Sequence, residues 1–115
     1  MEIIDIYTDG SSLGNPGPGG YGIVLKYKGQ RKTASEGFAK TTNNRMELMA
    51  VIQALHLLND AANNKEVHIY SDSKYVIDAV QKKWVFGWEK KGFKDKANPD
   101  LWRQFLAIYP NYTIH

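Results

Sequence analysis

The sequence predicts an α/β fold in which an antiparallel meander is joined to a parallel strand in one mixed sheet. Runs of β-branched and aromatic residues, separated by turn residues, come first and are typical of a meander. The apolar spacing then changes to a helical one, and another β-type run follows the helix, which predicts a crossover connection. The length of 115 residues suits a single domain over 1–115.

The expected elements follow one another without an internal repeat or a linker. Asp9-Gly10 is predicted to end the first strand, a bend is predicted near Gly87, and Pro110 is predicted to stop the last helix. Strands are expected over 3–8, 21–27, 31–39 and 67–70, helices over 44–60, 71–80 and 101–109, and the start of a fifth strand over 112–115.

Three acids stand at informative places in this topology. Asp9 and Asp72 follow the two strands that are expected to run parallel, and ligands gather at the carboxyl ends of such strands. Glu47 lies near the start of the helix that connects them. Three carboxylates at one sheet end repel each other unless a cation lies between them, and hard ions such as Mg²⁺ take oxygen ligands. The sequence therefore predicts a divalent-metal site.

Each acid also has a purely structural explanation. Asp9-Gly10 is a common turn signal. Glu47 lies three residues after Asn44, as in a capping box, and Asp72 precedes a helix that it could cap. Taken singly, the structural explanation is favoured for all three, and only their predicted convergence favours a metal site.

The positive charge is concentrated in a basic segment, defined as residues 82–96. It holds six lysines against two acids, or +4, which leaves −1 for the rest of the +3 chain. This concentration predicts a polyanionic partner. The alternative is a solvated charged helix whose aromatic residues face the core.

Composition excludes several classes of protein. The chain has no cysteine, so neither a disulfide framework nor a thiolate metal site is possible. No stretch is long and apolar enough to cross a membrane, and the acidic N-terminus is unlike a signal peptide. We expect a cytoplasmic protein with no membrane partner.

Five separated motifs, in order and at the family's spacing, resemble bacterial type 1 ribonuclease H. They are YTDGSSLGNPGPGGYG (7–22), TTNNRMELMAVIQAL (41–55), IYSDSKYV (69–76), the W…W…KKGF stretch (84–93) and NPDLW (98–102). The resemblance implies endonucleolytic cleavage of the RNA strand of RNA–DNA hybrids by two Mg²⁺ (or Mn²⁺) ions, leaving 5′-phosphates. It also implies that Asp9, Glu47 and Asp72, with Gly10 beside them, form the metal site.

The resemblance further implies the substrate contacts. Asn15, Asn43 and Asn44 fall on positions that meet the RNA strand in the minor groove, although the latter two could simply cap a helix. Thr42 matches part of a pocket for a DNA phosphate, with Arg45 assisting. Further contacts are expected from Lys74, which replaces a common glutamine, and from the family's basic protrusion at Trp84, Trp88, Lys90, Lys91 and Phe93. The histidines His56 and His68 are expected to be structural.

The chain departs from the family at its C-terminal end. The resemblance implies a five-stranded sheet with helices on both faces, yet the sequence stops inside the fifth strand, before the fourth carboxylate, a loop histidine and the last helix. Three explanations stay open: a fragment, a second chain that completes a fold expected to be monomeric, or a shortened and weakened relative. Rival functions are a hybrid-binding module without catalysis and an integrase-type or resolvase-type nuclease.

Overall fold

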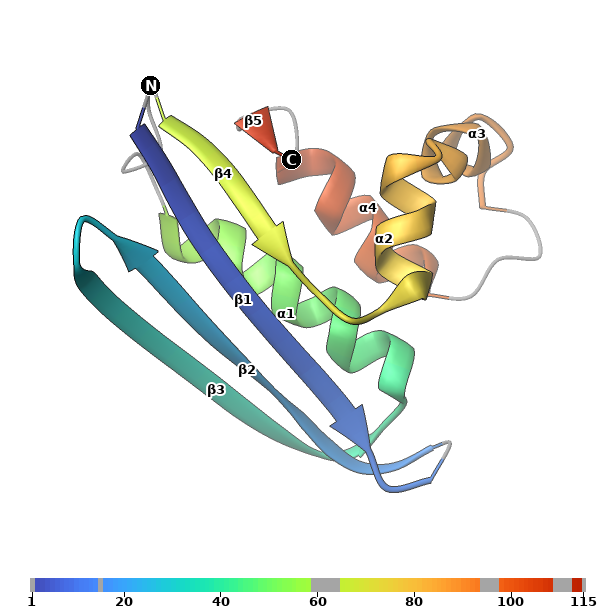
Figure 1. Cartoon of the computed structure of the whole chain (residues 1–115). Coiled ribbons are helices and arrows are strands. Elements are labelled where there is room, and N and C mark those ends of the chain that lie inside the picture. Colours follow the sequence, from blue (N-terminus) through green and yellow to red (C-terminus); the bar gives the residue numbers. More distant parts are fainter. Residues whose placement is uncertain (1, 15, 59–64, 94–97, 109–112, 115) are drawn as a thin grey trace.

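The computed structural model describes residues 2–14, 16–58, 65–93, 98–108 and 113–114. Figure 1 shows a sheet packed against a layer of helices, with strand order β3-β2-β1-β4-β5. The elements are β1 (Glu2–Ser12), β2 (Gly17–Tyr27), β3 (Gln30–Thr41), α1 (Asn43–Leu58), β4 (Lys65–Tyr70), α2 (Lys74–Gln81), α3 (Trp84–Lys90), α4 (Pro99–Ile108) and β5 (Thr113–Ile114).

The predicted mixed topology is confirmed. β1 pairs antiparallel with β2, and β2 pairs antiparallel with β3, which forms the meander. β4 lies parallel to β1 on its other side, with Ile4 opposite Val67 and Tyr7 opposite Tyr70. Four strands form the body of the sheet, and Thr113–Ile114 adds only a two-residue parallel pairing with β4.

The first strand runs further than the sequence predicts. β1 does not end at Asp9-Gly10 but continues to Ser12, with Gly10 opposite Tyr21 and Ser12 opposite Gly19. A Cβ at Gly10 would lie 2.6 Å from the backbone of Met46, so glycine here allows β1 and α1 to approach closely. The glycine that suggests a turn in the sequence therefore serves close packing.

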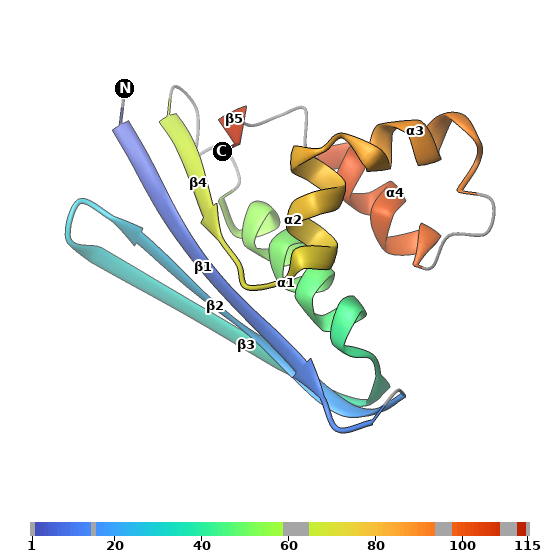
Figure 2. The same ribbon diagram turned by 45° about the vertical axis from the view of Figure 1, so that its right-hand side comes forward.

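The core lies between the sheet and α1. Alternate residues of β1, such as Ile4 and Ile6, face the helix and are buried. All the described helices lie on one side of the sheet (Figure 2). The sequence leads us to expect helices on both faces, but the described helices cover only one of them. On the open face, Tyr7 and Tyr70 stack with ring centroids 4.8 Å apart while remaining 41% and 46% exposed.

The helices α2 and α3 meet at a bend that the sequence places elsewhere. The predicted bend at Gly87 is wrong, because α3 runs through it and Val85 anchors this helix in the core. The change of direction occurs at Lys83, which has a left-handed backbone with φ of 61°. A glycine inside a helix costs only about 1 kcal/mol, which buried contacts offset.

The remaining helices match their predicted positions closely. The helix predicted over 44–60 is α1, although 59–60 lie outside the described residues. The helix predicted over 101–109 starts earlier, at Pro99, a residue suited to a first helical position; Tyr109 and Pro110 also lie outside the described residues. None of the helices in the described ranges is long and apolar enough to span a bilayer.

Candidate functional site

Two acids lie just beyond the same rung of the parallel strands. Tyr7 and Tyr70 are paired across β1 and β4, and Asp9 and Asp72 each follow two residues later. Both side chains are exposed. The parallel pairing therefore brings these acids to one end of the sheet, where the start of α1 also lies (Figure 1).

Glu47 is held between the two strand ends. Its carboxylate accepts a hydrogen bond from the Gly10 backbone N–H, next to Asp9, and interacts with the hydroxyl of Ser71, next to Asp72. Only 9% of Glu47 is exposed. This buried carboxylate accepts hydrogen bonds from β1 and from the residue that follows β4. It is therefore held between Asp9 and Asp72.

The three structural explanations for these acids are wrong. Asp9 lies inside β1 and not in a turn. The hydroxyl of Thr42 accepts the hydrogen bond from the Arg45 N–H at 3.2 Å, so Thr42 caps α1 and Glu47 has no part in a capping box with Asn44. The cap of α2 is Ser73, whose side chain accepts from the Val76 N–H, and not Asp72.

The electrostatics of Glu47 reflect crowding of like charges. Burial raises the pKa of its carboxyl group above the ordinary value, and repulsion from Asp9 and Asp72 raises it further, while the bonds from Gly10 and Ser71 act in the opposite direction. A bound cation would relieve this repulsion, and the donor set, made of carboxylate oxygens, suits a hard divalent ion. Within the described residues, however, no three acids or histidines are placed closely enough to enclose a single metal ion.

An open hollow of about 470 Å³ lies beside Asp9. Much of its lining is glycine backbone from neighbouring strands, so the surface is concave because side chains are missing. It also contains Glu36, which sequence reasoning missed. Glu36 accepts a hydrogen bond from the Tyr21 hydroxyl at 2.8 Å, and burial together with this acid raises the pKa of Tyr21 to about 12.

The asparagines expected to contact RNA differ in their surroundings. The side-chain oxygen of Asn43 accepts hydrogen bonds from the backbone N–H and the hydroxyl of Ser12, which tie the end of β1 to α1. Asn44 is exposed, and Asn15 lies outside the described residues. Neither Asn43 nor Asn44 is the cap of α1, because Thr42 fills that place. Asn44 is therefore the more available of the two.

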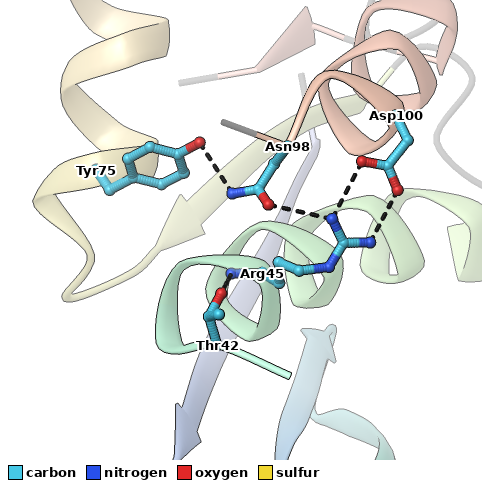
Figure 3. A network of polar contacts seen from close by, with 5 residues as sticks. All are labelled: Thr42, Arg45, Tyr75, Asn98 and Asp100. Atoms are coloured by element: carbon cyan, nitrogen blue, oxygen red, sulfur yellow. Dashed lines mark hydrogen bonds and ion pairs between the residues drawn. The ribbon is translucent and has the colours of Figure 1, made fainter. Parts of the chain in front are cut away.

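Arg45 does not lie open beside Thr42 as a free cation. Its guanidinium faces Asp100 at the start of α4, with Nη2 2.8 Å from a carboxylate oxygen (Figure 3). This ion pair raises the pKa of Arg45 and lowers that of Asp100. No local pattern in the sequence indicates this partner, which lies 55 residues away along the chain.

The aromatic residues of the basic segment are divided between surface and core. Trp84 is 47% exposed, with the Lys82 ammonium 5.1 Å from its ring centre. Phe93 is buried, and Trp88 is half-buried with its ring 5.9 Å from that of Trp102. The core-facing alternative therefore holds for Phe93 and partly for Trp88. The lysines of this segment at 82, 83, 90 and 91, like Lys74 on α2, are exposed, whereas 94–96 lie outside the described residues.

Comparison with known sequences gives consistent relatives. The sequence profile of the family described as RNase H matches residues 1–114. A ribonuclease H of Desulforamulus reducens is 50% identical over 99% of this chain and 73% of its own length. A ribonuclease H of Oleidesulfovibrio alaskensis is 46% identical over 99% of this chain and 75% of its own length.

Solved structures share the same fold. LC9-RNase H1, a type 1 RNase H with the type 2 active-site motif, superposes with a TM-score of 0.85 at 29% identity, covering 100% of this chain and 61% of that one. LC11-RNase H1 in complex with an RNA/DNA hybrid gives a TM-score of 0.67 at 27% identity, covering 97% of this chain and 83% of that one. The chain thus spans about three fifths to four fifths of these structures.

Proposed function

Because the chain belongs to the ribonuclease H family, we propose that it hydrolyses the RNA strand of RNA–DNA hybrids with the help of two divalent metal ions. The observation that carries this proposal is the position of Glu47, which receives hydrogen bonds from residues adjacent to Asp9 and to Asp72. Three acids from β1, α1 and the end of β4 then face one substrate.

The site residues in this proposal are Asp9, Glu47 and Asp72, with Gly10 fixing the second of them. These carboxylates would hold Mg²⁺ or Mn²⁺, and a bound ion would supply a water of lowered pKa and a positive charge beside the leaving oxygen. The Gly10 N–H orients the Glu47 carboxylate. The burial of Glu47 keeps away water that would compete for this carboxylate. Cleavage leaves a 5′-phosphate on one product and a 3′-hydroxyl on the other.

The hybrid is proposed to lie across the start of α1 and the basic segment. The Asn44 amide can both donate and accept, as a 2′-hydroxyl in the minor groove requires. The exposed lysines around Trp84 neutralise phosphates of the DNA strand. A neighbour of the same fold in complex with an RNA/DNA hybrid supports this choice of ligand.

A hybrid-binding module without catalysis is the second candidate. It is favoured by one observation, that no three acids or histidines among the described residues enclose a metal ion. It retains the basic surface and the asparagines but lacks turnover. The two candidates share a ligand and differ only in cleavage.

The experiment that separates them uses end-labelled RNA paired with DNA. With Mg²⁺, we expect cleavage within the RNA strand, none of duplex DNA, and none when a chelator replaces the metal. Salt-sensitive binding of the hybrid without cleavage in Mg²⁺ or Mn²⁺ would instead establish the binding module. Equal cleavage of duplex DNA would point to a DNA nuclease of the same fold.

A further inference from the structure

A polar network joins the start of α1 to the start of α4 and to α2. Arg45 Nη1 donates to Asn98 Oδ1 and Asp100 Oδ1, both at 3.1 Å, and Nη2 donates to Asp100 Oδ2 at 2.8 Å. Asn98 donates in turn to the Tyr75 hydroxyl at 3.2 Å. Figure 3 shows the Arg45 guanidinium between the two α4-side residues, with Tyr75 approaching from α2. One guanidinium thus connects segments far apart in the sequence.

The network continues into the basic segment through α4. The Trp102 indole N–H donates to the same Tyr75 hydroxyl at 2.8 Å. The rings of Trp102 and of Trp88 in α3 pack edge to face, with their centroids 5.9 Å apart. At the far end of the segment, the Arg103 guanidinium lies 5.1 Å from the ring centre of buried Phe93. α4 therefore supports α3, and Arg45 ties α4 to α1.

Asn98 is suited by its backbone to join these parts. Its φ of 61° is left-handed, a conformation that asparagine tolerates better than most residues. Its carbonyl accepts from the Trp102 N–H at 3.1 Å and so begins α4, while its side chain lies between Arg45 and Tyr75. The start of α4 and the polar bridge depend on the same residue.

We propose that Arg45 is a positioning residue, which acts through Asp100 and Asn98. It fixes the basic segment relative to the start of α1 at 42–44, so that both surfaces contact the same duplex. This inference rests on the proposed function. Arg45 makes a two-point ion pair with Asp100, so it offers a phosphate little net charge. Its role is to hold two binding surfaces at a set distance, and not to bind a phosphate itself.

Replacing Asp100 separates positioning from simple attraction by the sign of the effect. Asp100→Asn removes a negative charge from a protein that binds a polyanion and frees Arg45, so electrostatics alone predicts tighter binding. Loss of positioning predicts weaker binding. Glu89→Gln is the matched control, because it removes the same charge from an exposed site on α3 without touching the network.

The test measures hybrid binding and steady-state cleavage by the intact chain. For Asp100→Asn we expect KM and the dissociation constant to rise about 5-fold or more, within the usual range of coupling between sites, with kcat nearly unchanged. Glu89→Gln should bind as tightly as the wild type or tighter. Amides of 84–92 should exchange with solvent faster in Asp100→Asn, a readout that needs no substrate.

A double-mutant cycle completes the test. Arg45→Gln should weaken binding to the same extent as Asp100→Asn, the double variant should be no worse than either, and the slope of log affinity against log salt should stay unchanged. The inference is overturned if Asp100→Asn binds normally or more tightly, or if Arg45→Gln lowers the salt slope by about one. If the wild type itself neither binds nor cleaves the hybrid, the proposed function fails instead.

Discussion

Two charged clusters flank the start of α1, and they are built on opposite rules. Around Glu47, like charges gather: its pKa is raised by burial and by two neighbouring aspartates. Around Arg45, only two residues earlier, opposite charges are matched, and the pKa of Asp100 is lowered by its partner. On a helix, residues two apart point in nearly opposite directions, so one turn supplies both clusters.

The difference in charge balance indicates which of the two clusters is available to bind a ligand. The Arg45 cluster is satisfied within the protein, so it stabilises the fold and the placement of its elements. The Glu47 cluster is unfavourable within the protein, and a cation would make it favourable. The same comparison ranks the variants below.

The largest effect is expected from Asp9→Asn. It removes a proposed metal ligand and preserves size, so Mg²⁺-dependent cleavage should fall by more than about 100-fold, since even groups behind the ligands typically cost 10–100-fold. Hybrid binding, measured by fluorescence anisotropy, should change little. Normal cleavage by this variant would show that the site is assigned wrongly.

The next effect tests the network through Tyr75→Phe. The ring stays, but the Asn98 amide and the indole of the fully buried Trp102 lose their acceptor. The free energy of unfolding should therefore fall by about 2 kcal/mol, as for a buried donor left unpaired. Chemical denaturation measures this. Tyr70→Phe is the control: its exposed hydroxyl donates to Asp5 at 3.3 Å, and the change should stay within about 0.5 kcal/mol. Equal effects would contradict the account.

A smaller effect compares two substitutions that each remove one negative charge. Asp100→Asn should destabilise the metal-free protein by up to about 1 kcal/mol, as for an exposed ion pair. Glu47→Gln keeps an acceptor for the Gly10 N–H and removes repulsion. It should therefore slightly raise the free energy of unfolding at neutral pH, because a buried charge that Asp9 and Asp72 repel is removed. Effects of the same sign in thermal melts would remove the contrast between the clusters.

The smallest effect is the pH dependence of the Asp100 contribution. Because Arg45 lowers the pKa of Asp100 below the ordinary 3.8, the unfolded state takes up the proton first as pH falls. The stability difference between the wild type and Asp100→Asn should be constant near neutral pH. It should disappear as pH falls below about 4, through the lowered pKa. Urea midpoints of the wild type and Asp100→Asn, measured from pH 7 to pH 3, check this expectation. A stability difference that stays constant down to pH 3 would contradict it.

Local patterns in the sequence predicted most of the fold but not how its strands and helices end. Alternating apolar residues define β1 and β4, and helical spacing defines α1. The sequence predicts breaks at Gly10 and Gly87, yet both lie inside elements. A glycine carries no local signal that distinguishes close packing from a turn. In TTNN several residues are able to cap a helix, and only the backbone path selects Thr42.

The candidate site was predictable only as far as topology reaches. Asp9 and Asp72 follow from two parallel strands, and Glu47 from the helix that connects them. The Arg45 network was not predictable, because its contacts to Asn98 and Asp100 span 53 and 55 residues. No periodicity or spacing encodes such a pair, and the resemblance assigned Arg45 to the substrate instead.

The close approach of β1 and α1 at Gly10 has a consequence for any mutational survey of this chain. A methyl group added there would meet the backbone of Met46 and Glu47 and drive apart the two segments that carry the acids. A scan that scores each position by lost turnover would rank this residue with the carboxylates, although it contributes no reacting group. Loss of turnover at Gly10 would therefore reflect displaced segments, and turnover alone does not distinguish this from the loss of a metal-binding carboxylate.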